Sequence, residues 1–167
     1  MVGKALAFVL AGALLIFGLS LWPDARGWLT ERRLGAPSVS QGYGHGTVTF
    51  AETAVEALIP LTPERQAQGL AGRTRLGDGE GMLWVYGQPG YYRFWMKGML
   101  IPIDILWIQN QQVVEISTNL PPPATDQPAA WPTYQSQQPV NAVLEVASGF
   151  AARHRIAVGD QVDIDKR

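Results

Sequence analysis

The chain has 167 residues, a formal net charge of −1 and no cysteine. The charge gives no bulk attraction to nucleic acid, and the missing thiols exclude disulfides, thiolate metal sites and a cysteine nucleophile. Only two histidines and no phosphate-cradling glycine loop are present, so we predict no metal, no cofactor and no nucleic-acid partner.

The N-terminal segment contains an uncharged apolar run at residues 5–23, directly after Lys4. About 18 or more apolar residues can cross a bilayer as a helix, and Trp22 and Trp28 fall where an interfacial aromatic belt would lie. The alternative is a cleaved secretory signal with Lys4 as its positive region, but no clear small-residue cleavage site follows. We therefore predict a transmembrane anchor, or an uncleaved signal, in residues 1–23.

Residues 24–46 follow as a juxtamembrane tether that includes His45 in a glycine-rich stretch. The Lys and Arg count on the two sides of the anchor mildly favours a cytoplasmic domain. A short N-terminal segment ahead of a bulky domain nevertheless commonly exports that domain. We expect a single-pass protein of the cytoplasmic membrane with its C-terminal domain outside, in the periplasm or at the cell surface.

Residues 47–167 are enough for a single hydrophobic core. β-branched and apolar runs predict about seven strands, at 47–50, 55–59, 81–86, 91–97 and 101–108 (interrupted at Gly98), 113–118, 140–146 and 161–164. Thr62 as N-cap and Pro63 at the first helical position predict a short helix that ends near Gly72, and Ser148 caps a second one. The fold is expected to be α+β, one compact domain with a mostly antiparallel curled sheet and two short helices, plus the transmembrane helix.

Several short motifs appear in a fixed order. They are G-L-A-G-R (69–73), G-M-L-W-V-Y (81–86), F-W-M-K (94–97), I-P-I-D-I (101–105), V-L-E-V-A-S-G (143–149) and G-D (159–160). Together they resemble the DUF-192 family, a widespread prokaryotic domain of unknown function, over residues 55–164. The resemblance implies a fold and no activity, and family members often carry a signal or anchor ahead of the domain. Two departures stand out: Gly98 and Met99 replace the usual Asn-Thr, and Ala71 replaces the usual Met.

The strand around F-W-M-K carries a candidate binding face. Side chains alternate along a strand, so Arg93, Trp95 and Lys97 share one face, opposite Phe94 and Met96. Such a cationic, aromatic face suits a sugar, a peptide or an anionic polymer. The alternative is that the Arg and Lys stems merely cover the indole, in a cation–π contact of about 0.5–1 kcal/mol.

Asp104 is the acid in an otherwise apolar strand, so we expect it to be at least half buried and to need a partner. Arg73, Arg93 and backbone amides near Gly98 are the candidate partners. The functional interpretation makes Asp104 an acid or base with a shifted pKa, and the alternative makes it a structural ion pair.

Two further strand carboxylates, Glu115 and Glu145, could converge on Asp104 to serve hydrolysis or hold a hard cation. The Ser and Thr residues show neither a nucleophile elbow nor the spacing of a catalytic triad.

Residues 119–139 contain six prolines, which predicts a segment without regular structure. A structureless loop of about 20 residues is uncommon in a compact domain and is usually functional or disordered. Trp131 and Tyr134 could anchor it as a lid or rim over Trp95 and Asp104.

The sequence thus leaves the function unknown and favours binding over catalysis. The best interpretation is a membrane-anchored extracytoplasmic binding or accessory domain for a cell-envelope carbohydrate, peptide or protein. The candidate ligand-binding residues are Arg73, Arg93, Trp95, Lys97, Asp104, Trp131 and Tyr134. The alternatives are a small hydrolase or lyase that uses Asp104 with Arg73 and Glu115, and a structural subunit of a membrane complex.

Overall fold

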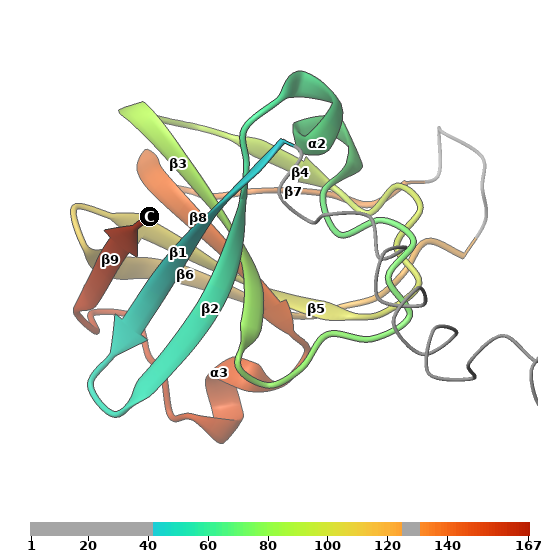
Figure 1. Cartoon of the computed structure of the whole chain (residues 1–167). Helices are drawn as coiled ribbons and strands as arrows, with labels where there is room; N and C mark the ends of the chain where they lie inside the picture. The colour runs from blue at the N-terminus through green and yellow to red at the C-terminus, as the bar shows by residue number, and fades with distance from the viewer. Residues whose placement is uncertain (1–41, 125–130) are drawn as a thin grey trace, which may run out of the picture. The chain divides into compact units, whose positions relative to one another are not determined.

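The computed structural model describes residues 42–124 and 131–167. A seven-stranded sheet in the order β6-β5-β8-β3-β2-β1-β9 is joined by a two-stranded sheet, β4-β7, and two short helices (Figure 1). The elements are β1 (Tyr43–Phe50), β2 (Thr53–Pro60), α2 (Pro63–Gln68), β3 (Glu80–Gly90), β4 (Arg93–Trp95), β5 (Ile103–Gln109), β6 (Gln112–Leu120), β7 (Thr133–Gln135), β8 (Val140–Ala147), α3 (Phe150–Arg153) and β9 (Val162–Lys166). Only β2 and β3 pair in parallel among these strands, so the predicted mostly antiparallel α+β domain is confirmed.

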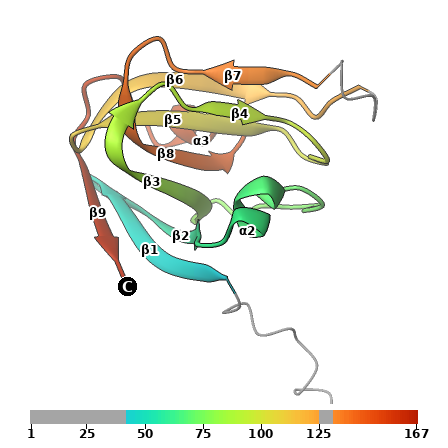
Figure 2. The same ribbon diagram turned by 90° about the horizontal axis from the view of Figure 1, so that it is seen from above.

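The main sheet curls until its two edge strands meet at one end (Figure 2). Gln112 at the start of β6 forms an antiparallel bridge with Gln161, next to β9. The amide of Val113 donates to the carbonyl of Asp160 at 2.9 Å, and the amide of Val162 donates to that of Gln111 at 2.8 Å. These bonds satisfy edge groups that would otherwise stay open, so the sheet forms a curled half-barrel.

The curled sheet has an apolar cluster on each of its two faces. The inner cluster includes Leu106 and Ile108 from β5, and helix α3 covers part of it through Phe150. The outer cluster includes Ile105 and Trp107 from the same strand, together with Leu70 after α2 and Phe94 and Tyr134 of the β4-β7 sheet. Strand β5 is therefore apolar on both faces, as its sequence predicts.

Several boundaries differ from the predicted ones for local physical reasons. Strand β1 begins at Tyr43, so the last residues of the predicted tether, His45 included, pair with β2. Helix α2 does start at the Thr62 cap, whose hydroxyl accepts from the amide of Arg65, but it ends before Gly69, whose φ of 53° breaks the helix. Gly149, in the left-handed region at φ 77°, replaces Ser148 as the N-cap of α3.

The proline-rich segment holds more regular structure than we expected. Strand β6 continues to Leu120, and β7 lies inside the segment and pairs with β4, the strand of the F-W-M-K motif. The prediction that residues 119–139 form no regular structure is therefore wrong at both ends of the segment. Short edge pairing tolerates nearby prolines because a proline lacks only its own donor.

The predicted transmembrane anchor and most of the tether lie outside the described residues. Among residues 42–124 and 131–167, no helix has the length and apolarity needed to cross a membrane.

Candidate functional site

A cavity of about 210 Å³ opens beside β4, between residues of α2, β3 and β8. Its polar and aromatic lining includes Trp84, Tyr86, Arg93, Trp95, Lys97 and Glu145. Trp84 to Lys97 lie close together in the sequence, in β3, in β4 and just after it, and only the folded sheet brings Glu145 of β8 beside them. A concave site with an apolar wall and a few convergent polar groups is the usual form of a small-ligand pocket.

Glu145 is the buried acid of this cavity, with only 6% of its surface exposed. The indole Nε1 of Trp84 donates a hydrogen bond to its Oε2 at 3.3 Å, and the described residues provide no second hydrogen-bond partner. Burial raises the pKa of Glu145 from 4.5 to about 7, and the Trp84 bond opposes that rise. Near neutral pH this carboxyl can therefore either donate or accept a hydrogen bond.

Arg93 and Lys97 form the basic rim of the cavity, and within the described part of the chain neither pairs with an acid. The guanidinium of Arg93 donates to Gln135 at 3.4 Å. The ammonium of Lys97 lies 5.6 Å from the Trp95 ring centre and 5.1 Å from that of Trp131. Trp95 nevertheless remains 50% exposed, so the expected cation–π contact is present without covering the ring.

The strand alternation predicted for this segment is confirmed. Phe94 and Met96 are buried, whereas Arg93, Trp95 and Lys97 are exposed. Phe94 packs edge-on against Trp84 at 5.2 Å and against Trp107 at 5.6 Å. These contacts fix the backbone of β4, and with it the outward direction of the rim side chains.

Tyr86 completes the aromatic wall and stacks on Tyr92 with a centroid distance of 3.4 Å. Burial raises the pKa of Tyr86 above its ordinary value, and neighbouring Tyr92 and Glu145 add to the rise. Its hydroxyl therefore stays protonated at physiological pH and is available as a donor.

Trp131 and Tyr134 of the proline-rich segment lie next to residues of this cavity, although neither of them lines it. Trp131 meets Trp95 edge-on at 6.2 Å, and Tyr134 lies opposite Phe94 in the β4-β7 pair. The described part of the segment thus forms a rim beside Trp95. Its first residue, Asn119, contacts Asp104 through a backbone amide, on the other side of the sheet from this rim.

Asp104 is fully buried, as expected, but its partners differ from those predicted. It accepts from the amide of Asn119 at 2.8 Å and from the amide of Ala151 at 3.2 Å. No ion pair with Arg73 or Arg93 is present in the described residues. The carboxylate ties the first turn of α3 to the end of β6, which is a structural role.

The sheet register separates the two buried acids. Asp104 lies opposite Val146, and Ile105 lies opposite Glu145. Paired residues share a face and successive residues alternate, so Asp104 points to the inner cluster and Glu145 to the outer cavity. The hypothesis that these carboxylates converge is therefore wrong.

Glu115 and Arg73 do not join either acid. Glu115 accepts from the amide of Gln137 at 2.8 Å, and Arg73 lies half-buried after α2, outside the lining of the cavity. The described residues contain no cluster of three or more His, Asp or Glu side chains that could hold a metal ion. The signal that singled out Asp104, an acid within an apolar strand, is equally present at Glu145.

The two departures from the family pattern are neighbours in space. A Cβ on Gly98 would lie 3.3 Å from the Cβ of Ala71, and Gly98 has a φ of 66°. The adjoining residues Leu70, Lys97 and Met99 line the cavity. The small pair Gly98 and Ala71 thus lies at the border of the site and offers no side-chain donor there.

The domain is similar to proteins whose structures are known. The model of the DUF192 family, described as "Uncharacterized ACR", matches residues 46–164. A protein of unknown function from Novosphingobium aromaticivorans DSM 12444 shares 34% identity, with a TM-score of 0.58 over 72% of this chain and 84% of that one. A Sinorhizobium meliloti 1021 protein, provisionally described as a transcription regulator, shares 25% identity, with a TM-score of 0.58 over 72% and 92% of the two chains. No curated protein matches the chain.

Proposed function

The chain belongs to the DUF192 family, whose function is open, and from that premise we propose that its domain binds an acidic saccharide in the cavity around Glu145. The observation that carries the proposal is the composition of this one cavity. Two cations without an acidic partner in the described residues, a half-exposed Trp95 and a buried carboxyl face the same small volume.

Each group matches one feature of a sugar acid. Arg93 can bind a carboxylate in a bidentate manner, and Lys97 adds a point charge beside it. The exposed Trp95 ring offers an apolar face to the sugar ring. Glu145, held by the Trp84 indole, supplies a carboxyl for hydroxyl groups.

The size of the cavity limits the ligand. Its volume of about 210 Å³ lies below the roughly 300–1,000 Å³ of pockets that enclose drug-sized molecules. The proposed ligand is therefore one sugar unit, either free or at the end of a chain. The net charge of −1 gives no general attraction to anionic polymers, so local cations must provide recognition.

NMR titration of the protein with D-glucuronate and with D-glucose tests the proposal. We expect saturable binding of glucuronate and at least tenfold weaker binding of glucose, because the neutral sugar cannot use Arg93 and Lys97. The variants Lys97→Gln and Trp95→Ala should each weaken glucuronate binding about tenfold or more. The matched controls are Lys166→Gln and Tyr91→Ala, an exposed cation and an exposed aromatic residue outside the cavity lining.

Two results would contradict the proposal. One is the absence of saturable binding for both sugars by a protein whose NMR spectrum shows it to be folded. The other is an equal loss of affinity in the control variants and in the cavity variants.

The apolar residues 5–23 support a second part of the proposal, that the domain is held outside the cytoplasmic membrane, where envelope saccharides occur. A fusion of alkaline phosphatase after Arg167 should be active in bacterial cells, because that enzyme matures only outside the cytoplasm. The same fusion without residues 1–23 should be inactive. An inactive full-length fusion that accumulates normally would place the domain inside.

A further inference from the structure

A second polar constellation lies on the other side of the fold, where α3 approaches the β1-β2 hairpin. The Nε2 atom of His154 lies 2.7 Å from Oδ2 of Asp78, and its Nδ1 atom lies 3.2 Å from Oγ1 of Thr53. Thr53, Asp78 and His154 come from three separate parts of the sequence. Their order in space is hydroxyl, imidazole, carboxylate, which is the order of groups in an activated-nucleophile triad.

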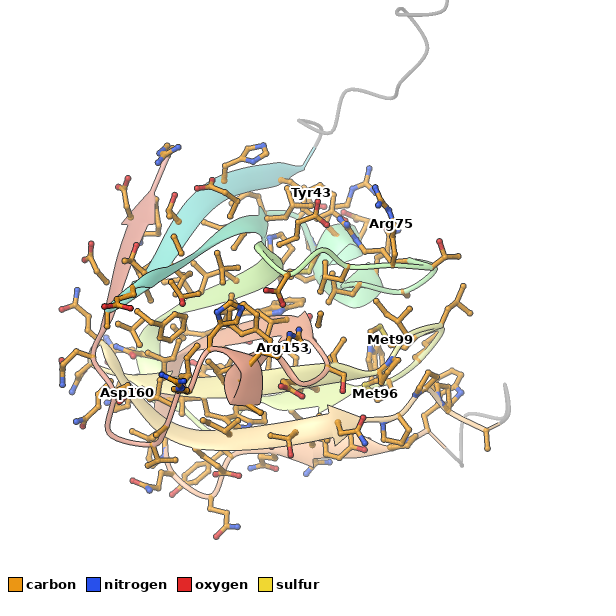
Figure 3. All side chains as sticks on the ribbon, turned by 90° about the horizontal axis from the view of Figure 1, so that it is seen from below. Tyr43, Arg75, Met96, Met99, Arg153 and Asp160 are labelled. Carbon is orange, nitrogen blue, oxygen red and sulfur yellow. The ribbon has the colours of Figure 1, made fainter. Side chains whose placement is uncertain are left out.

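Asp78 is fixed as an ionised acceptor. The guanidinium of Arg153 donates to its Oδ1 through Nε at 3.0 Å and Nη2 at 2.6 Å. Hydrogen bonds from Arg153, and next from His154, lower the pKa of Asp78. Figure 3 labels Arg153 at helix α3.

The ionised Asp78 determines which nitrogen of His154 carries the proton. A carboxylate only accepts hydrogen bonds, so Nε2 of His154 must carry the hydrogen that points to Asp78. In the neutral imidazole, Nδ1 then holds a lone pair and accepts from the Thr53 hydroxyl. Contact of the ring with Phe150, at a centroid distance of 4.4 Å, adds to its fixed orientation.

A cavity of about 670 Å³ adjoins the constellation and is lined by both Thr53 and His154. Arg153 and Arg155 line it together with Glu52 and Asp160, so its charged residues balance. Figure 3 shows Asp160 on the segment that leads into β9. A cavity of this volume suits a small molecule, and the balanced charge favours an uncharged one.

We propose that Thr53, His154 and Asp78 form a hydrolytic site for small uncharged carboxylic esters, separate from the cavity around Glu145. The Thr53 oxygen attacks the ester carbonyl carbon while its proton passes to Nδ1 of His154. The bond from the carbonyl carbon to the alcohol oxygen then breaks, and that oxygen leaves with the proton from His154. Water next attacks the acyl-Thr53 ester and gives a proton to His154. The acyl–oxygen bond breaks, the Thr53 oxygen regains that proton, and the net reaction converts ester and water into alcohol and acid.

An esterase assay with p-nitrophenyl acetate and covalent labelling with a fluorophosphonate, both on the full-length protein, test the site. We expect ester hydrolysis and a covalent adduct that peptide mapping assigns to Thr53. Thr53→Val keeps the shape of the side chain without the hydroxyl, so it should abolish the adduct. Thr53→Ser should retain it, because the hydroxyl is restored. His154→Gln should lower kcat at least 100-fold, since general-base help contributes about 10²–10⁴.

Thr49→Val is the matched control, because Thr49 is an exposed threonine of β1 outside the cavity lining. It should keep the activity and the adduct of the wild-type protein. Asp78 is a positioning residue, so Asp78→Asn should lower kcat while KM stays within about twofold. The proposal is overturned if no adduct maps to Thr53, or if a folded Thr53→Val variant hydrolyses the ester at the wild-type rate.

Discussion

Replacing Asp104 by Ala is expected to cost about 2–4 kcal/mol of unfolding free energy. The substitution orphans the buried amide of Ala151, which costs about 1–3 kcal/mol, and removes the partly buried hydrogen bond from Asn119, worth about 0.5–1.5 kcal/mol. Because whole domains are stable by only about 5–15 kcal/mol, this one change removes a large share of the total. Urea unfolding of the purified variant measures the loss.

Asp104→Asn separates the two hydrogen bonds from the charge. Asparagine keeps one acceptor oxygen and turns its amide toward the other backbone donor, so we expect an intermediate loss. Hydrogen exchange at Ala151 should accelerate in both variants because the first turn of α3 loses its anchor. Asp163→Ala, at an exposed carboxylate on β9, is the control and should stay within about 0.5 kcal/mol of wild type. A stability of Asp104→Ala equal to that of this control would refute the structural role.

Replacing Glu145 by Gln is expected to remove a pH dependence of stability that the wild-type domain carries. The folded-state pKa of Glu145 is about 7, raised by burial from 4.5, so between these values the folded protein binds more protons than the unfolded chain. The contribution of Glu145 to the unfolding free energy is therefore fully present below pH 4.5 and is lost as the pH rises through 7. Over that interval the unfolding free energy falls by about 3 kcal/mol, because each pKa unit of difference corresponds to about 1.36 kcal/mol.

The measurement compares the unfolding free energies of the Glu145→Gln variant and the wild-type protein at several pH values. Glutamine keeps an acceptor for the Trp84 indole and does not ionise. The unfolding free energy of the variant, relative to that of the wild type, should therefore rise by about 3 kcal/mol from pH 4.5 to pH 8. Glu52→Gln replaces an exposed acid, so its unfolding free energy should change with pH as that of the wild type does. A difference between Glu145→Gln and wild type that does not change with pH would show that the carboxyl is not desolvated.

The local sequence was sufficient to predict those conformations that neighbouring residues determine. The Thr62 cap and the following Pro63 predict the start of α2, and the alternation around Phe94 predicts which β4 side chains face outward. The extent of each element was less predictable. Strand β7 forms only because β4 offers it an open edge, and that edge is a property of the folded sheet.

The sequence by itself determined that two acids, Asp104 and Glu145, lie in apolar strands, that Arg93, Trp95 and Lys97 share a face, and that the domain has the pattern of its family. The tertiary structure alone decided what each acid contacts. Because of the strand register, Asp104 points to the inner face and accepts from two backbone amides, whereas Glu145 points to the outer cavity beside Arg93 and Lys97. It also brings Thr53, Asp78 and His154 together across about 100 residues of chain. Side-chain convergence depends on strand order and register, which are set by long-range pairing rather than by any local run of residues.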